Sequence, residues 1–146
     1  MAITQAIANS FKKELLEGEH NFKSSGGDKF KIALYTSSAT LNSATTAFTA
    51  TGEVSNTGQY TSGGGALTNS GTSITAGVAR VDFADRSFTG VTLTARGALI
   101  YNTSATATNA AVCALDFVAD KTATSGVFTI QFPAATSTAA ILRISG

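Results

Sequence analysis

Apolar and polar positions alternate along the chain with a period that changes near residue 30. Between residues 3 and 16, one apolar side chain recurs at every fourth position: Ile3, Ile7, Phe11 and Leu15. This spacing is typical of one face of an amphipathic helix, and Gly18 follows as a residue that favours a helix end. The pattern therefore predicts a helix over residues 3–16, and SSGGDK at 24–29 predicts a flexible joint after it.

From residue 30 onward, apolar residues recur with the period of two that is typical of β-strands. Strands with turn residues between them are predicted at 30–36, 66–75, 78–84, 91–101, 111–118, 126–132 and 139–145. Many short strands joined by turns are typical of an antiparallel β-sandwich or jelly roll. We therefore predict a mainly β protein, with an N-terminal helix and joint over residues 1–23 and a sandwich domain over residues 24–146.

Residues 37–65 interrupt the alternation and consist mostly of Ser, Thr, Gly and Ala, with Glu53 as their only charged residue. Loops of this length usually carry function or lack a fixed structure. Apolar or aromatic side chains are spaced along it as anchors would be: Leu41, Phe48, Val54 and Tyr60. We expect this region to be a contact arm that binds a partner and is mobile in the free monomer.

The predicted helix also needs an apolar surface to cover its stripe. It can pack on the sheet of its own domain or dock on a neighbouring subunit. The flexible joint slightly favours the neighbouring subunit, and three acids near the helix end would suit a positively charged partner: Glu14, Glu17 and Glu19. The stripe residues are therefore candidate interface residues, together with the four anchors of the arm.

The chain has 146 residues, enough for one domain, and only 13% of them are charged, with a formal net charge of +1. Ordinary soluble domains carry about twice that share of charged residues. A weakly charged surface suits a protein packed against copies of itself or a partner, and no basic excess attracts nucleic acid. No apolar run reaches the roughly 18 residues of a membrane span, and the start lacks signal-peptide features. We expect synthesis in a cytoplasm and no nucleic-acid or membrane partner.

One histidine and one cysteine, His20 and Cys113, cannot form a zinc site within one chain. We expect His20 at the surface or in the joint, and Cys113, set among apolar residues, as a buried thiol. No G-x-S-x-G motif is present, and the glycines at 63–65 lack the lysine of a phosphate loop. They are expected in a turn with positive φ. The sequence thus predicts no metal, no cofactor and no enzyme.

Paired carboxylates for glycoside hydrolysis are the remaining catalytic candidates: Asp82, Asp85, Asp116 and Asp120. Each pair has a basic neighbour close by in the sequence. Asp82 and Asp116 each precede a phenylalanine and a turn-like stretch, so two similar hairpin corners are predicted there. Ion pairs at these corners explain the four aspartates at least as well as a cell-wall hydrolase does.

Arg96 lies in the middle of a predicted strand, on the face opposite Ala95 and Gly97. That face begins with threonines and becomes apolar, as if it were covered at one end. An arginine there can lay its stem on the sheet and direct its guanidinium at a carboxylate. Asp82 and Asp116 are the candidate partners within the chain, and an ion pair across a subunit interface is the alternative.

Several short motifs together resemble a family of small virion proteins encoded by tailed bacteriophages. They are Ala33-Leu34-Tyr35, Glu53-Val54, Gly58-Gln59-Tyr60 with Gly63-Gly64, Thr94-Ala95-Arg96 and Ile100-Tyr101. The resemblance covers nearly the whole chain. This chain departs from it in having Gly-Gln-Tyr where relatives usually have Gly-Tyr, and Phe88 where they often have Trp. The resemblance implies a structural role in the virion and no catalysis.

We therefore expect a capsid decoration or cement protein that binds the phage major capsid protein as a homo-oligomer, with a trimer favoured because it matches the local symmetry of an icosahedral shell. Binding would be purely associative, with weak contacts multiplied over many copies. The alternative is a tail-associated fibre or adaptor protein that contacts tail proteins and the host surface.

Overall fold

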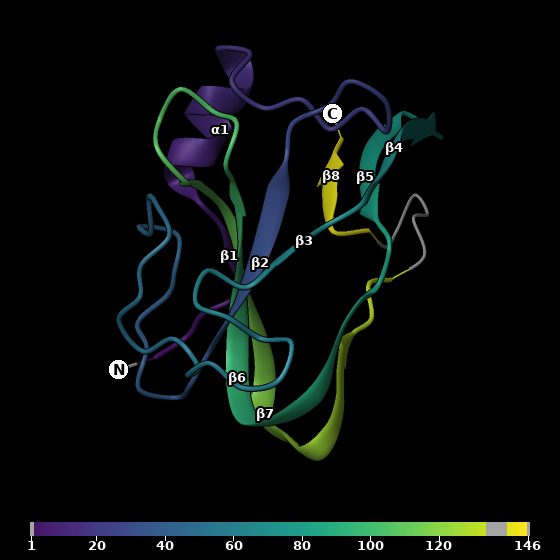
Figure 1. Cartoon of the computed structure of the whole chain (residues 1–146). Coiled ribbons are helices and arrows are strands. Elements are labelled where there is room, and N and C mark those ends of the chain that lie inside the picture. Colours follow the sequence, from purple (N-terminus) through teal and green to yellow (C-terminus); the bar gives the residue numbers. More distant parts are fainter. Residues whose placement is uncertain (1, 134–139, 146) are drawn as a thin grey trace.

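The computed structural model describes residues 2–133 and 140–145 (Figure 1). It is mainly β, with two antiparallel sheets and one short helix near the N-terminus, as predicted. The elements along the chain are β1 (Ala6–Ile7), α1 (Asn9–Leu16), β2 (Phe30–Tyr35), β3 (Gly65–Ala66), β4 (Asn69–Thr75), β5 (Val78–Phe83), β6 (Arg86–Asn102), β7 (Ala110–Ile130) and β8 (Leu142–Ile144). The arrangement is consistent with the predicted sandwich.

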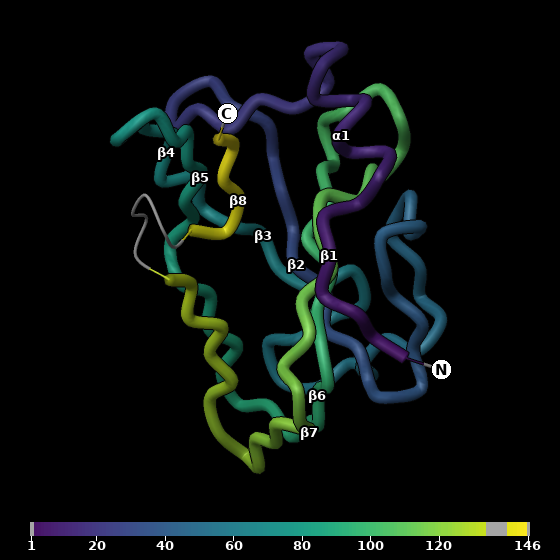
Figure 2. Tube along the Cα trace, turned by 180° about the vertical axis from the view of Figure 1, so that it is seen from behind, coloured from purple at the N-terminus to yellow at the C-terminus, as the bar shows by residue number. Residues whose placement is uncertain are grey.

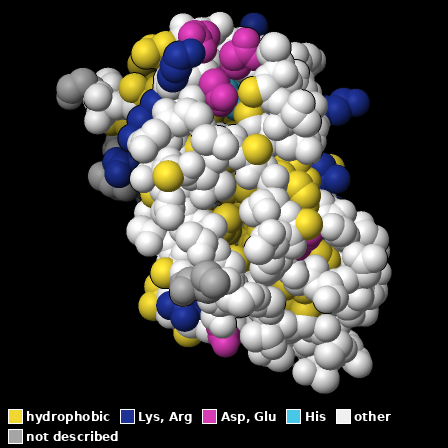
Figure 3. Space-filling view, turned by 90° about the vertical axis from the view of Figure 1, so that its left-hand side faces the viewer, with side chains coloured by type: hydrophobic (Ala, Val, Ile, Leu, Met, Phe, Trp, Pro, Cys, Tyr) yellow, Lys and Arg dark blue, Asp and Glu magenta, His cyan; other side chains and the backbone are white. Residues whose placement is uncertain are grey.

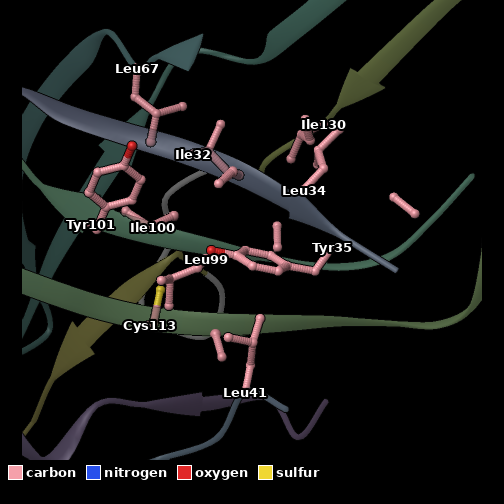
Figure 4. Packing of buried hydrophobic residues seen from close by; sticks show 14 of the residues in the cluster. Ile32, Leu34, Tyr35, Leu41, Leu67, Leu99, Ile100, Tyr101, Cys113 and Ile130 are labelled. Atoms are coloured by element: carbon pink, nitrogen blue, oxygen red, sulfur yellow. The ribbon is translucent and has the colours of Figure 1, made fainter. Parts of the chain in front are cut away.

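The larger sheet has five strands in the order β1-β7-β6-β2-β3. β2 pairs with β6 from Phe30 opposite Asn102 to Tyr35 opposite Gly97. All residues of β2 except Lys31 are buried, so both of its faces are covered. Figure 4 shows side chains of these central strands in one cluster, with Leu41 of the following loop below them.

The smaller sheet has three strands in the order β4-β5-β8 and lies on one face of the larger sheet (Figure 1). Aromatic rings join the two layers. The ring of Phe30 on β2 stacks on Phe22 at 4.5 Å and meets Phe83 of β5 at 5.5 Å between centroids. The Phe30–Phe83 contact joins the two sheets directly, and Phe22, which lies between strands in the sequence, packs on both rings.

Residues 36–64, here called the covering loop, lie over the opposite face and along the part of the β2 edge that β3 does not pair with (Figure 1). Phe48 packs on Tyr101 with centroids 5.0 Å apart, and the Tyr35 hydroxyl donates to the Thr49 carbonyl at 2.7 Å. Leu41 and Tyr60 are fully buried and Val54 nearly so. The expected contact arm is therefore corrected, because these anchors are buried in the core of their own chain.

The N-terminal segment also differs from the prediction. The helix begins only at Asn9, and Ala6–Ile7 form a strand that pairs with Ala114 and Cys113 of β7. Ile3 lies in a parallel bridge with Leu41, and the Thr4 N–H donates to the Leu41 carbonyl at 2.8 Å. A spacing of four residues also places side chains on one face of a strand, so the apolar pattern did not distinguish the two structures.

The helix packs on its own domain. Ile3 and Phe11 are buried in the core, and Ile7 and Leu15 are partly buried against it. Figure 2 shows the segment from the N-terminus through β1 to α1 running along the larger sheet beside β7. The interpretation of the whole stripe as a surface for a neighbouring subunit is corrected, because the chain's own core covers Ile3 and Phe11 and leaves only Ile7 and Leu15 partly accessible.

Three of the predicted strands are parts of two long, bent ones, since 91–101 lies within β6 and both 111–118 and 126–132 overlap β7. Register shifts and positive φ angles at Gly90, Val118 and Ser125 let the paired strands bend without ending. The predicted hairpin corner at Asp116 is wrong, because β7 continues through it. At Asp82 the chain instead nears the end of β5 and then crosses to the larger sheet.

Candidate functional site

A hydrogen-bond network centred on Glu53 fastens the covering loop. Its carboxylate accepts bonds from the Tyr60 hydroxyl at 2.8 Å, the Ser62 hydroxyl at 2.8 Å and the Gly63 N–H at 2.7 Å. The Tyr60 hydroxyl in turn accepts the Leu34 N–H at 2.8 Å. A buried tyrosine hydroxyl thus takes the place of a strand neighbour at the edge of β2, where an unpaired N–H would be costly.

The glycines at 63–65 complete this network as backbone turn residues. Gly63 and Gly64 have φ of 95° and 80°, and the Gly63 carbonyl accepts the Tyr101 hydroxyl at 2.5 Å. A side chain on Gly64 would collide with the Ile32 carbonyl of β2. The expected turn with positive φ is confirmed at Gly63 and Gly64, whereas Gly65 begins β3. The motifs around Glu53, Tyr60 and Gly63 are brought together as a structural lock.

The three tyrosines of this region remain protonated at neutral pH. Burial is the largest cause of the raised pKa of Tyr35, Tyr60 and Tyr101, and the nearby Glu53 carboxylate raises each pKa further. For Tyr101 the pKa rises to about 12. Protonated hydroxyls donate hydrogen bonds but cannot act as bases, so this chemistry serves to hold the loop.

Arg96 pairs with Asp116 within the chain. The Nε–Oδ1 distance is 3.3 Å, and the two side chains are 36% and 24% exposed, so solvent screens the pair. The same Asp116 oxygen accepts the Val118 N–H at 2.8 Å, where β7 has a positive φ. Asp82 lies on β5 in the smaller sheet. The pair therefore joins β6 to β7 at the bend rather than forming a binding site.

His20 is buried, which corrects the expected surface position. Its Nδ1 lies 2.9 Å from Asn102 Nδ2 and its Nε2 lies 3.0 Å from Glu14 Oε1. Asn102 donates from Nδ2 to the Asp28 carboxylate and accepts the Ser104 N–H at Oδ1, which fixes its orientation. His20 Nδ1 must then accept, and Nε2–H must donate to Glu14.

The predicted joint is correspondingly a closed turn. The Asp28 N–H donates to the Asn21 carbonyl at 2.7 Å, and the Asp28 carboxylate accepts the Asn21 N–H at 2.9 Å. This turn lays His20 on the ring of Phe11 with centroids 4.7 Å apart. Sequence analysis missed the site because Asn102 is 82 residues from His20, a separation that no local pattern reveals.

Cys113 lies in β7 as the buried thiol that the sequence predicts. Burial raises its pKa to about 12, so the reactive thiolate is not populated at neutral pH. No group of three metal-ligating side chains occurs within residues 2–133 and 140–145. Within the same ranges, no helix is long and apolar enough to span a membrane.

An apolar groove of about 180 Å³ opens between α1 and the smaller sheet. The N-terminal wall is formed by Ile7, Phe11 and Leu15, and the facing wall by Val81, Leu142 and Ile144. Ile144 is 59% exposed and Leu16, next to the groove in sequence, is 90% exposed. The sequence predicted both the stripe of the first wall and the strands 78–84 and 139–145 of the second, but no local pattern indicated that the two walls face each other.

Figure 3 shows the side of the molecule formed by α1 and the covering loop. Acidic side chains gather at the top of this view, over α1, whereas the lower part carries few charges and is mostly polar and uncharged. The three carboxylates at the helix end account for this acidic patch: Glu14, Glu17 and Glu19. This face thus offers apolar and weakly polar contacts together with a region where acidic side chains gather.

No protein-family model matches this chain, and neither a curated protein nor a solved structure is significantly similar to it.

Proposed function

We propose that this chain is a structural protein of a bacteriophage virion, and specifically a decoration or cement protein of the capsid. The observation that carries the proposal is the apolar groove between α1 and the smaller sheet, which opens beside the exposed Leu16 and Ile144. Exposed apolar side chains next to an apolar groove are typical of a protein–protein contact. The resemblance of the sequence to small virion proteins is the reason for proposing a phage particle as the partner.

The chemistry of the buried polar groups supports an associative role. Glu53, Tyr60 and Tyr101 bond one another or the backbone of the covering loop, and His20 bonds Glu14 and Asn102. These groups hold the fold and point into it. The chain therefore acts by binding, with itself as a homotrimer and with the major capsid protein, and without a cofactor or a catalytic residue.

Many weak contacts give such a protein its effect. One copy on a shell buries modest area, but a trimer binds through three sites at once, and the effective concentration after the first contact raises the overall affinity. Each bound trimer then bridges neighbouring capsid subunits and resists their separation. This mechanism requires a stable, protease-resistant monomer fold, and the locked covering loop supplies that property.

Copy number in purified virions tests the proposal. Quantitative mass spectrometry against isotope-labelled peptides of this chain should find copies in a fixed ratio to the major capsid protein, in the hundreds per particle. A dozen copies or fewer would instead identify a tail component. Absence from purified particles, or hydrolysis of cell-wall glycan by the isolated chain, would contradict a structural role in the virion.

A further inference from the structure

His20 joins the N-terminal segment to the end of β6. It is the only histidine of the chain, and its side chain is wholly shielded from solvent. Figures 1 and 2 show α1 beside the loop that follows β6. The ring of His20 packs on Phe11 with centroids 4.7 Å apart and lies nearly parallel to Phe30 at 6.5 Å. The polar contacts of this buried ring are made by its two nitrogens.

The neutral ring has one nitrogen for each polar neighbour. Nε2–H donates to Glu14, 3.0 Å away, and Nδ1 accepts from Asn102 at 2.9 Å. A second proton can attach only at Nδ1, because Nε2 already carries one. It would place an N–H directly against the N–H of the Asn102 amide, where two donors face each other without an acceptor.

Asn102 cannot resolve this conflict by rotating its amide. Its Nδ2 also donates to the Asp28 carboxylate at 2.8 Å, and its Oδ1 accepts the Ser104 N–H at 2.8 Å. Rotation by half a turn would set Oδ1 against the carboxylate oxygen and Nδ2 against the Ser104 N–H. Asn102 is fully buried, so bulk water does not replace the lost hydrogen bonds, and their loss is costly.

Three carboxylates lie around His20. Glu14 on α1 contacts the ring, Asp28 in the turn lies beyond Asn102, and Glu19 is the neighbour of His20 in the chain. Negative charges attract a proton to the ring. The neutral bridge has no place for that proton, so the attraction favours an arrangement in which the imidazolium contacts carboxylates and Asn102 is displaced.

We propose that His20 is a pH switch within the fold: the neutral ring fastens the N-terminal segment to β6 through Asn102, and protonation of Nδ1 breaks that bridge. Loss of the bridge also loosens the turn at 21–28, because the same Asp28 carboxylate binds Asn102 and the Asn21 N–H. The switch is a property of the chain itself and does not depend on the virion assignment.

The direction of the pH effect follows from where the proton binds. The closed site holds a neutral ring, whereas an opened site lets the imidazole take up a proton near the ordinary value for histidine, about pH 6.5. The contribution of the bridge is therefore complete above about pH 7 and is lost as the pH falls below about 6.5. At pH 5.5, the equilibrium constant for opening should be about tenfold larger than at pH 7.5.

Nuclear magnetic resonance of the full chain tests the switch. At pH 7.5, the nitrogen shifts of the His20 ring should report a proton on Nε2 and none on Nδ1. Between pH 7.5 and pH 5.5, the ring should take up a proton and the Asn102 side-chain amide signals should move in the same step. Hydrogen-exchange protection of the Asn21 and Ser104 backbone amides, which bond the two side chains of the bridge, should fall about tenfold after correction for intrinsic exchange.

Two substitutions distinguish a switch from a merely structural role. His20→Gln removes the titrating ring and should abolish the step. Asn102→Asp supplies a carboxylate that accepts from a protonated Nδ1, so opening should be rarer at pH 5.5 than at pH 7.5, the reverse of wild type. Asn9→Asp, the same change at an exposed position of α1, should keep the wild-type response.

Several results would overturn the inference. One is a wild-type ring that carries its proton on Nδ1 at pH 7.5. Another is protonation at pH 5.5 that leaves the Asn102 and Ser104 signals unchanged, and a third is a step that persists in His20→Gln. An Asn102→Asp protein that still opens more at low pH would also contradict it. If Asn102→Asp does not fold, the wild-type spectra and His20→Gln decide the outcome.

Discussion

The two faces of the larger sheet are closed by different means. On one face, the smaller sheet packs through the rings of Phe22, Phe30 and Phe83. On the other face and along the edge of β2, a Ser-, Thr- and Gly-rich loop is held by Tyr60, Glu53 and other polar anchors. The comparison teaches that a segment of low hydrophobicity can close a core. It needs only a few aromatic side chains whose polar ends bond the backbone.

Raising the pH should disrupt the tyrosine hydrogen bonds that hold the covering loop, and should thereby unfold the whole chain. The folded-state pKa of Tyr101 is about 12 and those of Tyr35 and Tyr60 are also raised, whereas the unfolded value is about 10. Stability is therefore complete below pH 10 and is lost as pH rises through the folded-state pKa values. Tyrosinate absorbance and circular dichroism should change in one step. Ionisation near pH 10 with the fold intact would mean that the loop opens freely.

Matched truncations should then compare the two closures directly. Phe30 and Tyr60 are both fully buried anchors, one beneath the smaller sheet and one in the covering loop. We expect Phe30→Ala and Tyr60→Ala each to lower the free energy of unfolding by about 3–5 kcal/mol. Urea unfolding measures both. A loss below about 1 kcal/mol for Tyr60→Ala alone would show that the loop is an appendage rather than a layer of the core.

Glu53→Gln sharpens the comparison by removing the carboxylate and keeping the shape. A glutamine has one oxygen where Glu53 uses two to accept three hydrogen bonds. We expect a loss of about 1–3 kcal/mol in the free energy of unfolding and faster proteolysis within residues 36–64. Asp120→Asn, the same change at an exposed carboxylate, serves as the control and should have no measurable effect. Equal stability of the two variants would contradict the lock.

The smallest effect is expected at Arg96, which is part of neither the aromatic contact with the smaller sheet nor the covering loop. Its 3.3 Å pair with Asp116 is partly exposed, so Arg96→Met should lower the free energy of unfolding by about 0–1 kcal/mol. Asp116→Ala should be more harmful, because this residue also accepts the Val118 N–H. Thermal unfolding distinguishes the two. An Arg96→Met variant that is as stable as wild type but loses a ligand would identify a binding site instead.

Local sequence patterns predicted what depends on local chemistry. The alternation in 30–36 identified β2, the glycines at 63–65 identified a turn, and the apolar setting of Cys113 identified its burial. In each case the neighbouring residues determine the structure. The sequence also named Asp116 as one of two candidate partners of Arg96, because both aspartates lie near the ends of predicted strands.

The features that failed depend on contacts between distant segments. Nothing near His20 indicates Asn102, and nothing in the covering loop indicates that Tyr60 would bond the backbone of Leu34. The stripe in 3–16 suited a strand and a helix equally in its first half. In β7, the polar stretch that resembled a turn is the exposed bend of one long strand, where apolar alternation is not required.

The order of strands in the larger sheet also bears on when this protein can fold. β1 pairs with residues 113 and 114, and β2 pairs with residues 97–102, so the first strands to leave the ribosome wait for partners synthesised much later. At about 5–20 residues per second, this interval lasts roughly 5–20 seconds. During it Ile3, Phe11 and Phe30 remain in water. We therefore expect nascent chains shorter than about 110 residues to be bound by general chaperones, and the native sheet to form only after β7 emerges.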